Sequence, residues 1–162
     1  MLHLIPAPLH RALYRLAHTA RLGWWRIRRP QITGCSAVVR NAAGSVLLVR
    51  HSYGRGNWAL PGGGVQRGED PAATVVRELA EETGVRLEHL TALGPLDEML
   101  GGARNRVHLF AATTRDTPRA DNRELVDARF FPVVQLPADV ARQSRIRIDI
   151  WLRAAEAGSR PD

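Results

Sequence analysis

The sequence contains one cysteine, no lysine and no long apolar run, and each shortage excludes something. A single cysteine, Cys35, rules out a disulfide within the chain and fits a reducing compartment. No apolar stretch approaches the roughly 20 residues that a helix needs to span a bilayer. The 162 residues, 44% hydrophobic and 24% charged, suit one globular domain with a real core. We therefore expect a cytoplasmic protein in which Cys35 belongs to the core.

Acidic residues are absent from residues 1–30, which hold six arginines. The net charge of the whole chain is +7, so subtracting these six leaves +1 for the remaining 132 residues. The basic character therefore belongs to one segment and not to the domain that follows. Its apolar residues recur at helical spacing, which predicts an amphipathic helix over about residues 9–25. They are Leu9, Leu13, Leu16, Ala17 and Ala20.

The basic segment has three possible partners, ranked by their chemistry. Packing on the domain or forming a homodimer comes first, with the arginines in solvent. Peripheral contact with an anionic membrane surface comes second, because Trp24 and Trp25 suit an interfacial position. Nucleic acid comes last, since only the positive charge favours it.

From residue 31 onward, the pattern alternates between strand and helix signals. Asp70 and Pro71 are typical of a helix start, and Gly84 is placed to end that helix. A second helix is expected over residues 144–157, where an alternating pattern also permits a strand. Residues 114–124 read as a polar loop. Strands are predicted at residues 32–39, 46–49, 86–93, 106–113 and 129–132.

Three glutamates in the helix that starts at Pro71 indicate a cation site. Glu78, Glu81 and Glu82 stand at i, i+3 and i+4, so they share one helix face and repel one another. A solvated acidic face is the plainer explanation, but the opposite face is apolar and a triple glycine lies just upstream. Carboxylate oxygens suit Mg²⁺ or Mn²⁺, and the carbonyl of Gly63 can approach an ion closely. Arg77 can orient a carboxylate or offset the local charge.

The same residues resemble a named pattern. Gly63, five residues, Glu69, seven residues and then residues 77–85, RELAEETGV, match the box of the Nudix hydrolase family at every defined position. At typical residue frequencies, chance agreement in this chain is on the order of 10⁻⁷ or less. The resemblance implies an α/β fold, an α/β/α sandwich on a mixed β-sheet, with the additional N-terminal helix outside it. It divides the chain into a basic segment, 1–30, and a Nudix domain, 31–160.

The resemblance also implies an activity: metal-dependent hydrolysis of the pyrophosphate bond in a nucleoside diphosphate linked to another moiety. Nucleotide sugars, ADP-ribose, (d)NTPs and dinucleotides are the substrate types expected. By motif position, Glu78 and Glu82 would be the main ligands of Mg²⁺ or Mn²⁺, with Glu81 in support. The Gly63 carbonyl would complete the ligand set, and Arg77 would take part in catalysis.

A distal acid is expected to join this site as a further metal ligand or as the general base. Glu124 is the preferred candidate and Asp127 the second. Asp116, Asp121 and the pair Asp97–Glu98 are expected to be solvated. Trp58 is expected to pack rather than to stack on a base. Two other functions stay open, a non-catalytic nucleotide-binding or regulatory Nudix domain and a pyrophosphohydrolase of RNA 5′ ends.

Overall fold

A computed structural model describes residues 7–158, with a sheet built around β1 (Gln31–Arg40). β1 pairs in parallel with β5 (Ala103–Thr113), and β5 pairs antiparallel with the edge strand β4 (Glu88–Leu100). On its other side, β1 meets β2 (Val46–His51), which also pairs with β3 (Trp58–Ala59) and β6 (Leu125–Phe131). The sheet is therefore mixed, as the sequence predicts.

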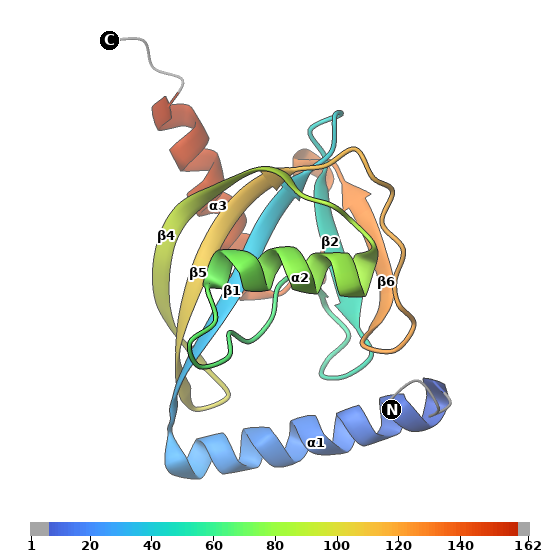
Figure 1. Cartoon of the computed structure of the whole chain (residues 1–162), viewed down its shortest axis with the longest axis vertical. Helices are drawn as coiled ribbons and strands as arrows, with labels where there is room; N and C mark the ends of the chain where they lie inside the picture. Colours follow the sequence, from blue (N-terminus) through green and yellow to red (C-terminus); the bar gives the residue numbers. More distant parts are fainter. Residues whose placement is uncertain (1–6, 159–162) are drawn as a thin grey trace.

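Each face of the sheet is covered by one helix (Figure 1). α2 (Pro71–Thr83) buries Val75 and Leu79 against one face, in a core that includes Cys35. α3 (Arg142–Gly158) buries Ile148 and Trp151 against the other, in a core that includes Trp58. The predicted α/β/α sandwich is confirmed, and so is the expectation that Cys35 and Trp58 are core residues.

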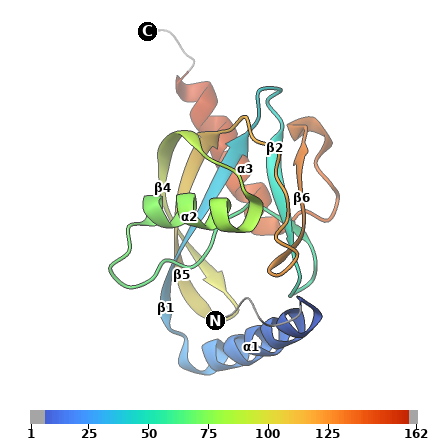
Figure 2. The ribbon, with the colours of Figure 1, turned by 45° about the vertical axis from the view of Figure 1, so that its right-hand side comes forward.

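α1 (Ala7–Arg28) lies outside these layers, across one end of the sheet (Figures 1 and 2). It contacts the turn between β4 and β5, where Gly101 and Gly102 have positive φ and no side chain to block the approach. A Cβ at Gly102 would lie 2.9 Å from the Cα of Arg26. The predicted helix is confirmed and extends beyond residues 9–25 at both ends. Within residues 7–158, no helix is long and apolar enough to cross a membrane.

Several strands depart from the prediction. β5 begins at Ala103 and β6 at Leu125, earlier than the predicted starts at 106 and 129. β4 runs to Leu100 although Gly94 and Pro95 suggest a break, because its register shifts between Ala92 and Gly94 and because Pro95 is tolerated on an edge strand. β3 was not predicted, since its two residues pair with β2 and carry no pattern of their own. The C-terminal segment is a helix, as expected.

Candidate active site

The helix α2 starts and ends where the sequence predicts. The carboxylate of Asp70 accepts the backbone N–H groups of Ala72 and Ala73 at 3.3 and 3.2 Å. Gly84 ends the helix in the left-handed conformation, with φ 68°, and its N–H donates to the Ala80 carbonyl. These caps fix the two ends of α2, and the burial of Val75 and Leu79 turns its apolar face to the sheet.

The three glutamates of α2 have different environments. The carboxyl of Glu82 is buried, with 7% of the residue exposed. The side chain of Glu78 is 19% exposed and that of Glu81 62% exposed. Their spacing places them together, as predicted, but only Glu78 and Glu82 face the interior. Glu81 lies at the rim, where it can support the site but does not form its floor.

Arg77 holds three carboxylates at once. Its Nη2 lies 3.0 Å from Oε1 of Glu69 and 3.0 Å from Oε1 of Glu78, and its Nη1 lies 3.2 Å from Oε2 of Glu81. These partners raise the pKa of Arg77 well above its usual range. The backbone N–H of Gln66 and the guanidinium together lower the pKa of Glu69. Arg77 therefore fixes the position of Glu78 from a site outside the acidic cluster.

Burial and mutual repulsion disfavour the charged forms of the inner acids. Burial, followed by the charges of Glu124, Glu78 and Asp121, raises the pKa of Glu82 to about 8. Burial also raises the pKa of Glu78, with the nearby Arg77 acting in the opposite direction. Because burial and mutual repulsion oppose ionisation, these carboxylates need a compensating positive charge when they ionise.

The loop before β6 brings Glu124 to the helix. The N–H of Ser52 donates to the Glu124 carbonyl at 2.8 Å, and the charge of Glu124 raises the pKa of Glu82. Asp127, the second distal candidate, pairs instead with Arg129, at 2.7 Å. The structure therefore favours Glu124 over Asp127 as a member of the cluster, while its chemical role stays a prediction.

The expectation that Asp121 is a solvated loop charge was wrong. Its Oδ1 accepts the backbone N–H groups of Arg123, Glu124 and Leu125 at 3.0, 3.1 and 2.9 Å. Its own N–H donates to the Glu82 carbonyl at 3.1 Å. Asp121 thus ties the loop that carries Glu124 to the end of α2.

Asp116 is accessible to solvent, as expected, with 31% of its side chain exposed, and it also links two segments. Its Oδ2 accepts the backbone N–H of Arg86 at 2.9 Å, and this bond and the Arg86 side chain lower its pKa. The bond joins the loop after β5 to the segment that follows α2. Asp116 is therefore a structural link and has no part in the acidic cluster.

Gly63 contacts Glu78 so closely that a side chain at position 63 would displace the Glu78 carboxylate. A Cβ at Gly63 would lie 2.9 Å from Cδ of Glu78, whereas one at Gly64 would meet nothing within 4 Å. The backbone of Gly63 pairs with that of Cys35, its carbonyl accepting at 2.9 Å and its N–H donating at 3.1 Å. The sheet thus holds Gly63 beside Glu78, and a cation would share its carbonyl with the Cys35 N–H.

The donor set fits a hard divalent cation such as Mg²⁺ or Mn²⁺. Glu78, Glu82 and Glu124 supply carboxylate oxygens whose charges raise one another's energy, and Gly63 leaves room beside them. Within residues 7–158, no three acidic, histidine or cysteine side chains converge as a finished metal centre. Arg77 pairs with only one carboxylate oxygen of Glu78, Oε1.

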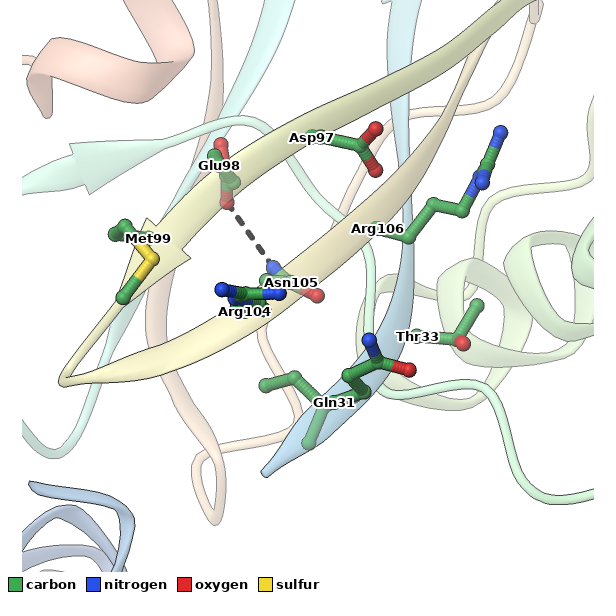
Figure 3. A pocket seen from close by; sticks show the side chains of 9 residues that line it. Gln31, Thr33, Asp97, Glu98, Met99, Arg104, Asn105 and Arg106 are labelled. Carbon is green, nitrogen blue, oxygen red and sulfur yellow. Dashed lines mark hydrogen bonds between the residues drawn. The ribbon is translucent and has the colours of Figure 1, made fainter. Parts of the chain in front are cut away.

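A cavity of about 280 Å³ opens on the other side of Gly63. Its polar lining includes Glu98 and Asn105, which also line a hollow of about 720 Å³ along β4 and β5 (Figure 3). Nδ2 of Asn105 donates to Oε1 of Glu98 at 3.0 Å, and Nη2 of Arg147 donates to the same oxygen at 2.8 Å. Glu98 was expected to be solvated, and this was wrong because Arg147 of α3 pairs with it and its side chain is only 18% exposed.

Tyr53 is a neighbour of the acidic cluster that the sequence did not reveal. Burial, followed by the charges of Glu124 and Glu82, raises the pKa of its hydroxyl to about 12. The tyrosine lies in the loop after β2, which carries no motif. Only the fold brings this loop to α2, so no spacing in the sequence could have indicated it.

Comparisons with known proteins show the family and the fold. The model of the NUDIX domain matches residues 30–152, so the chain belongs to the Nudix family. The MutT NUDIX hydrolase from Burkholderia pseudomallei has the same fold, with a TM-score of 0.67 and 27% identity over 74% of this chain and 96% of that one.

Two relatives are similar in sequence. One is an RNA pyrophosphohydrolase of Halorhodospira halophila, 32% identical over 69% of this chain and 55% of that protein. The other is named as a mutator protein, MutT4, of Mycobacterium tuberculosis, 29% identical over 82% of this chain and 58% of that protein. The chain thus spans little more than half the length of either relative.

Proposed function

We propose that this chain is a divalent-metal-dependent pyrophosphohydrolase that cleaves a nucleoside diphosphate linked to another moiety. The observation that carries the proposal is the buried Glu82 beside Glu78 and Glu124, three acids whose charges make one another unfavourable. A stable fold retains such a cluster at a cost in stability, and cation binding is the function that offsets this cost. Membership of the Nudix family supports the same reaction.

Each residue has a role in this proposal. A bound Mg²⁺ or Mn²⁺ would polarise phosphoryl oxygens and offset the charge that develops in the transition state. Glu78 and Glu82 would hold the ion, with Glu81 and the Gly63 carbonyl in support, and Arg77 orients Glu78.

Glu124 accepts the proton of the attacking water as the general base. Water attacks phosphorus, the bridging P–O bond breaks, and the electron pair leaves with the departing phosphate. The chain's own contribution is to position the water, the ion and the two phosphates.

The nucleoside part of the substrate would occupy the cavity behind Gly63. Its volume of about 280 Å³ is near the lower end for small-ligand pockets, about 300 Å³. Glu98 can accept hydrogen bonds from base or ribose, while Asn105 and Arg147 can donate. The cavity adjoins Gly63, so a nucleoside there would place its phosphates beside Glu78.

A substrate panel with product identification tests the proposal. The purified chain is incubated with nucleotide sugars, ADP-ribose, (d)NTPs and dinucleoside polyphosphates, each with Mg²⁺, with Mn²⁺ and with a chelator. We expect turnover of at least one class, lost with the chelator and in Glu82→Gln. Nucleotide binding seen by calorimetry without turnover of any substrate would instead indicate a non-catalytic regulatory domain.

RNA 5′ ends are a second candidate substrate. The 32% identical relative named as an RNA pyrophosphohydrolase favours it, and so do the six arginines of residues 1–30. Pyrophosphate release from 5′-triphosphorylated RNA should then weaken steeply as salt rises, because phosphate contacts release counterions. Cleavage of free nucleotides with no activity on RNA would exclude this candidate.

A further inference from the structure

One side of α1 is attached to the domain. The side chains of Leu22 and Trp25 lie against Gly101, and the backbone of Arg26 lies against Gly102, so Leu22 and Trp25 mark the inner side of the helix. In both Figure 1 and Figure 2, the rest of the described chain lies on one side of α1. The outer side of the helix therefore faces away from the domain.

The outer side of α1 carries large apolar residues in solvent. Ile27 is 82% exposed, Leu16 69% and Trp24 52%. Leu16 and Ile27 are eleven residues apart, about three full turns, so they lie almost in line along the helix. Seen down the helix axis, Trp24 lies about 60° from Ile27. Exposed apolar residues in one line on a helix mark an interaction surface more often than scattered ones do.

Arginines flank this apolar face on both edges. Arg28 lies about 100° around the helix from Ile27 in one direction, and Arg26 about 100° in the other. Both are exposed, and no acidic residue occurs anywhere in residues 1–30. An apolar strip with a cation on each edge is the pattern of a helix that lies in the plane of an anionic lipid surface. Tryptophan at the strip's edge suits the headgroup region.

Two other partners fit this surface less well. A second copy of the chain would bring its own arginines against these arginines with no acid to pair with them, and like charges repel across an interface. Nucleic acid would pair with the arginines but would leave Ile27 and Leu16 without an apolar partner. Only a lipid surface matches both the charge and the apolar strip.

We propose that the outer face of α1, formed by Leu16, Trp24 and Ile27 with Arg26 and Arg28 at its edges, docks on anionic lipid bilayers. Docking does not depend on the reaction at the Glu82 site, so it stands or fails apart from the proposed hydrolase activity. The domain, which lies on the other side of α1, would face the aqueous phase.

Flotation of the full chain with vesicles tests the proposal. We expect the protein to bind vesicles that contain phosphatidylglycerol and not vesicles of phosphatidylcholine alone. Ile27→Glu places a carboxylate in the apolar strip and should weaken binding by at least about tenfold. Val134→Glu is the matched control, because Val134 is 91% exposed on another element and should tolerate the change. Circular dichroism should show that both variants fold.

Several outcomes would overturn the proposal. Absence of vesicle binding, or equal loss in both variants, would remove the lipid partner. A dimer in light scattering that Ile27→Glu dissociates would assign this face to a second copy of the chain. Binding to an RNA oligonucleotide that Ile27→Glu abolishes, without vesicle binding, would assign it to nucleic acid.

Discussion

Arg147 on α3 and Glu98 on β4 form an ion pair in the cavity behind Gly63. Nη2 and Oε1 are 2.8 Å apart, and the two side chains are only 13% and 18% exposed. Nε of Arg147 is buried and has no hydrogen-bond partner among residues 7–158. Two charges withdrawn from water cost stability that their attraction barely recovers. A buried pair with an unused donor at a cavity wall is therefore suited to ligand recognition.

Glu98→Gln should weaken substrate binding. The change removes the negative charge but keeps the shape, so we expect KM to rise about tenfold while kcat changes little, the signature of lost ground-state binding. Arg147 loses its counter-charge, and the free energy of unfolding should fall by about 2 kcal/mol, less than for a fully buried pair. Steady-state kinetics and urea unfolding measure the two effects.

The control for this variant is Glu88→Gln in the same strand. Glu88 pairs with Arg115 at 3.6 Å, and the arginine side chain is 87% exposed. Loss of this ion pair should lower the free energy of unfolding by less than about 1 kcal/mol. An unchanged KM for every substrate in Glu98→Gln would show that the cavity holds no part of the substrate.

Gly63→Ala should impair catalysis where Gly64→Ala does not. The new methyl at position 63 would lie 2.9 Å from Cδ of Glu78 and push this carboxylate away, whereas a methyl at position 64 meets nothing within 4 Å. We expect kcat/KM to fall by about 100-fold in the first variant and by less than about threefold in the second. Equal kinetics of both variants would mean that the position of Glu78 has no effect on the reaction.

The local features of the site follow from the sequence because they lie within one helix and its caps. Asp70, Gly84 and the spacing of Glu78 and Glu82 need no tertiary information, so the start, end and acidic face of α2 are predicted correctly. The pattern of apolar residues likewise predicts the sandwich. These are the features that propensity and periodicity encode.

The rest depends on contacts between distant segments. Arg147 and Glu98 lie 49 residues apart, and nothing near either residue indicates the other. In the sequence, Asp121 cannot be distinguished from any other acidic loop residue, because the backbone N–H groups that donate to it are seen only in the structure. The predicted strand at residues 86–93 ends too early, because Gly94 and Pro95 taken alone resemble a turn, whereas β4 continues to Leu100. Tertiary context decides each of these cases, and local pattern cannot.

Glu82→Gln should remove activity and stabilise the metal-free protein. Loss of the buried carboxylate should lower kcat by about 100-fold or more, since one strong electrostatic interaction with the transition state disappears. The same change removes the charge whose burial, followed by repulsion from the neighbouring acids, raises the pKa of Glu82 to about 8, so the apparent Tm in chelator at pH 9 should rise. Differential scanning calorimetry measures this. A Tm equal to or below that of the unchanged chain would contradict the assigned burial.

The pH dependence has a definite sign. The pKa of Glu82 is about 8 in the folded chain against an ordinary value of 4.5, so the folded state binds this proton more tightly. Stability from this group is full below pH 4.5 and is lost as the pH rises to 8. Metal-free protein should therefore unfold at a lower temperature at pH 9 than at pH 6, and Glu82→Gln should reduce that difference. Added Mg²⁺ should raise the unfolding temperature at pH 9.

Asp121→Ala should separate the loop of Glu124 from the end of α2. Three backbone N–H groups would lose the acceptor Oδ1, and we expect the free energy of unfolding to fall by about 1–2 kcal/mol. Glu124 would lose its fixed position, so kcat should fall by about tenfold if this residue is the general base.

The matched variant Asp121→Asn keeps an acceptor oxygen and removes only the charge. Its stability and kcat should therefore stay close to those of the unchanged chain. The reason is that the hydrogen bonds accepted by Oδ1 hold the loop of Glu124, and the negative charge does not. If Asp121→Asn were as impaired as Asp121→Ala, the negative charge beside Glu82 would be the essential property. If neither variant changed kcat, Glu124 would not be the residue that accepts the proton, since its loop could move without effect on the reaction.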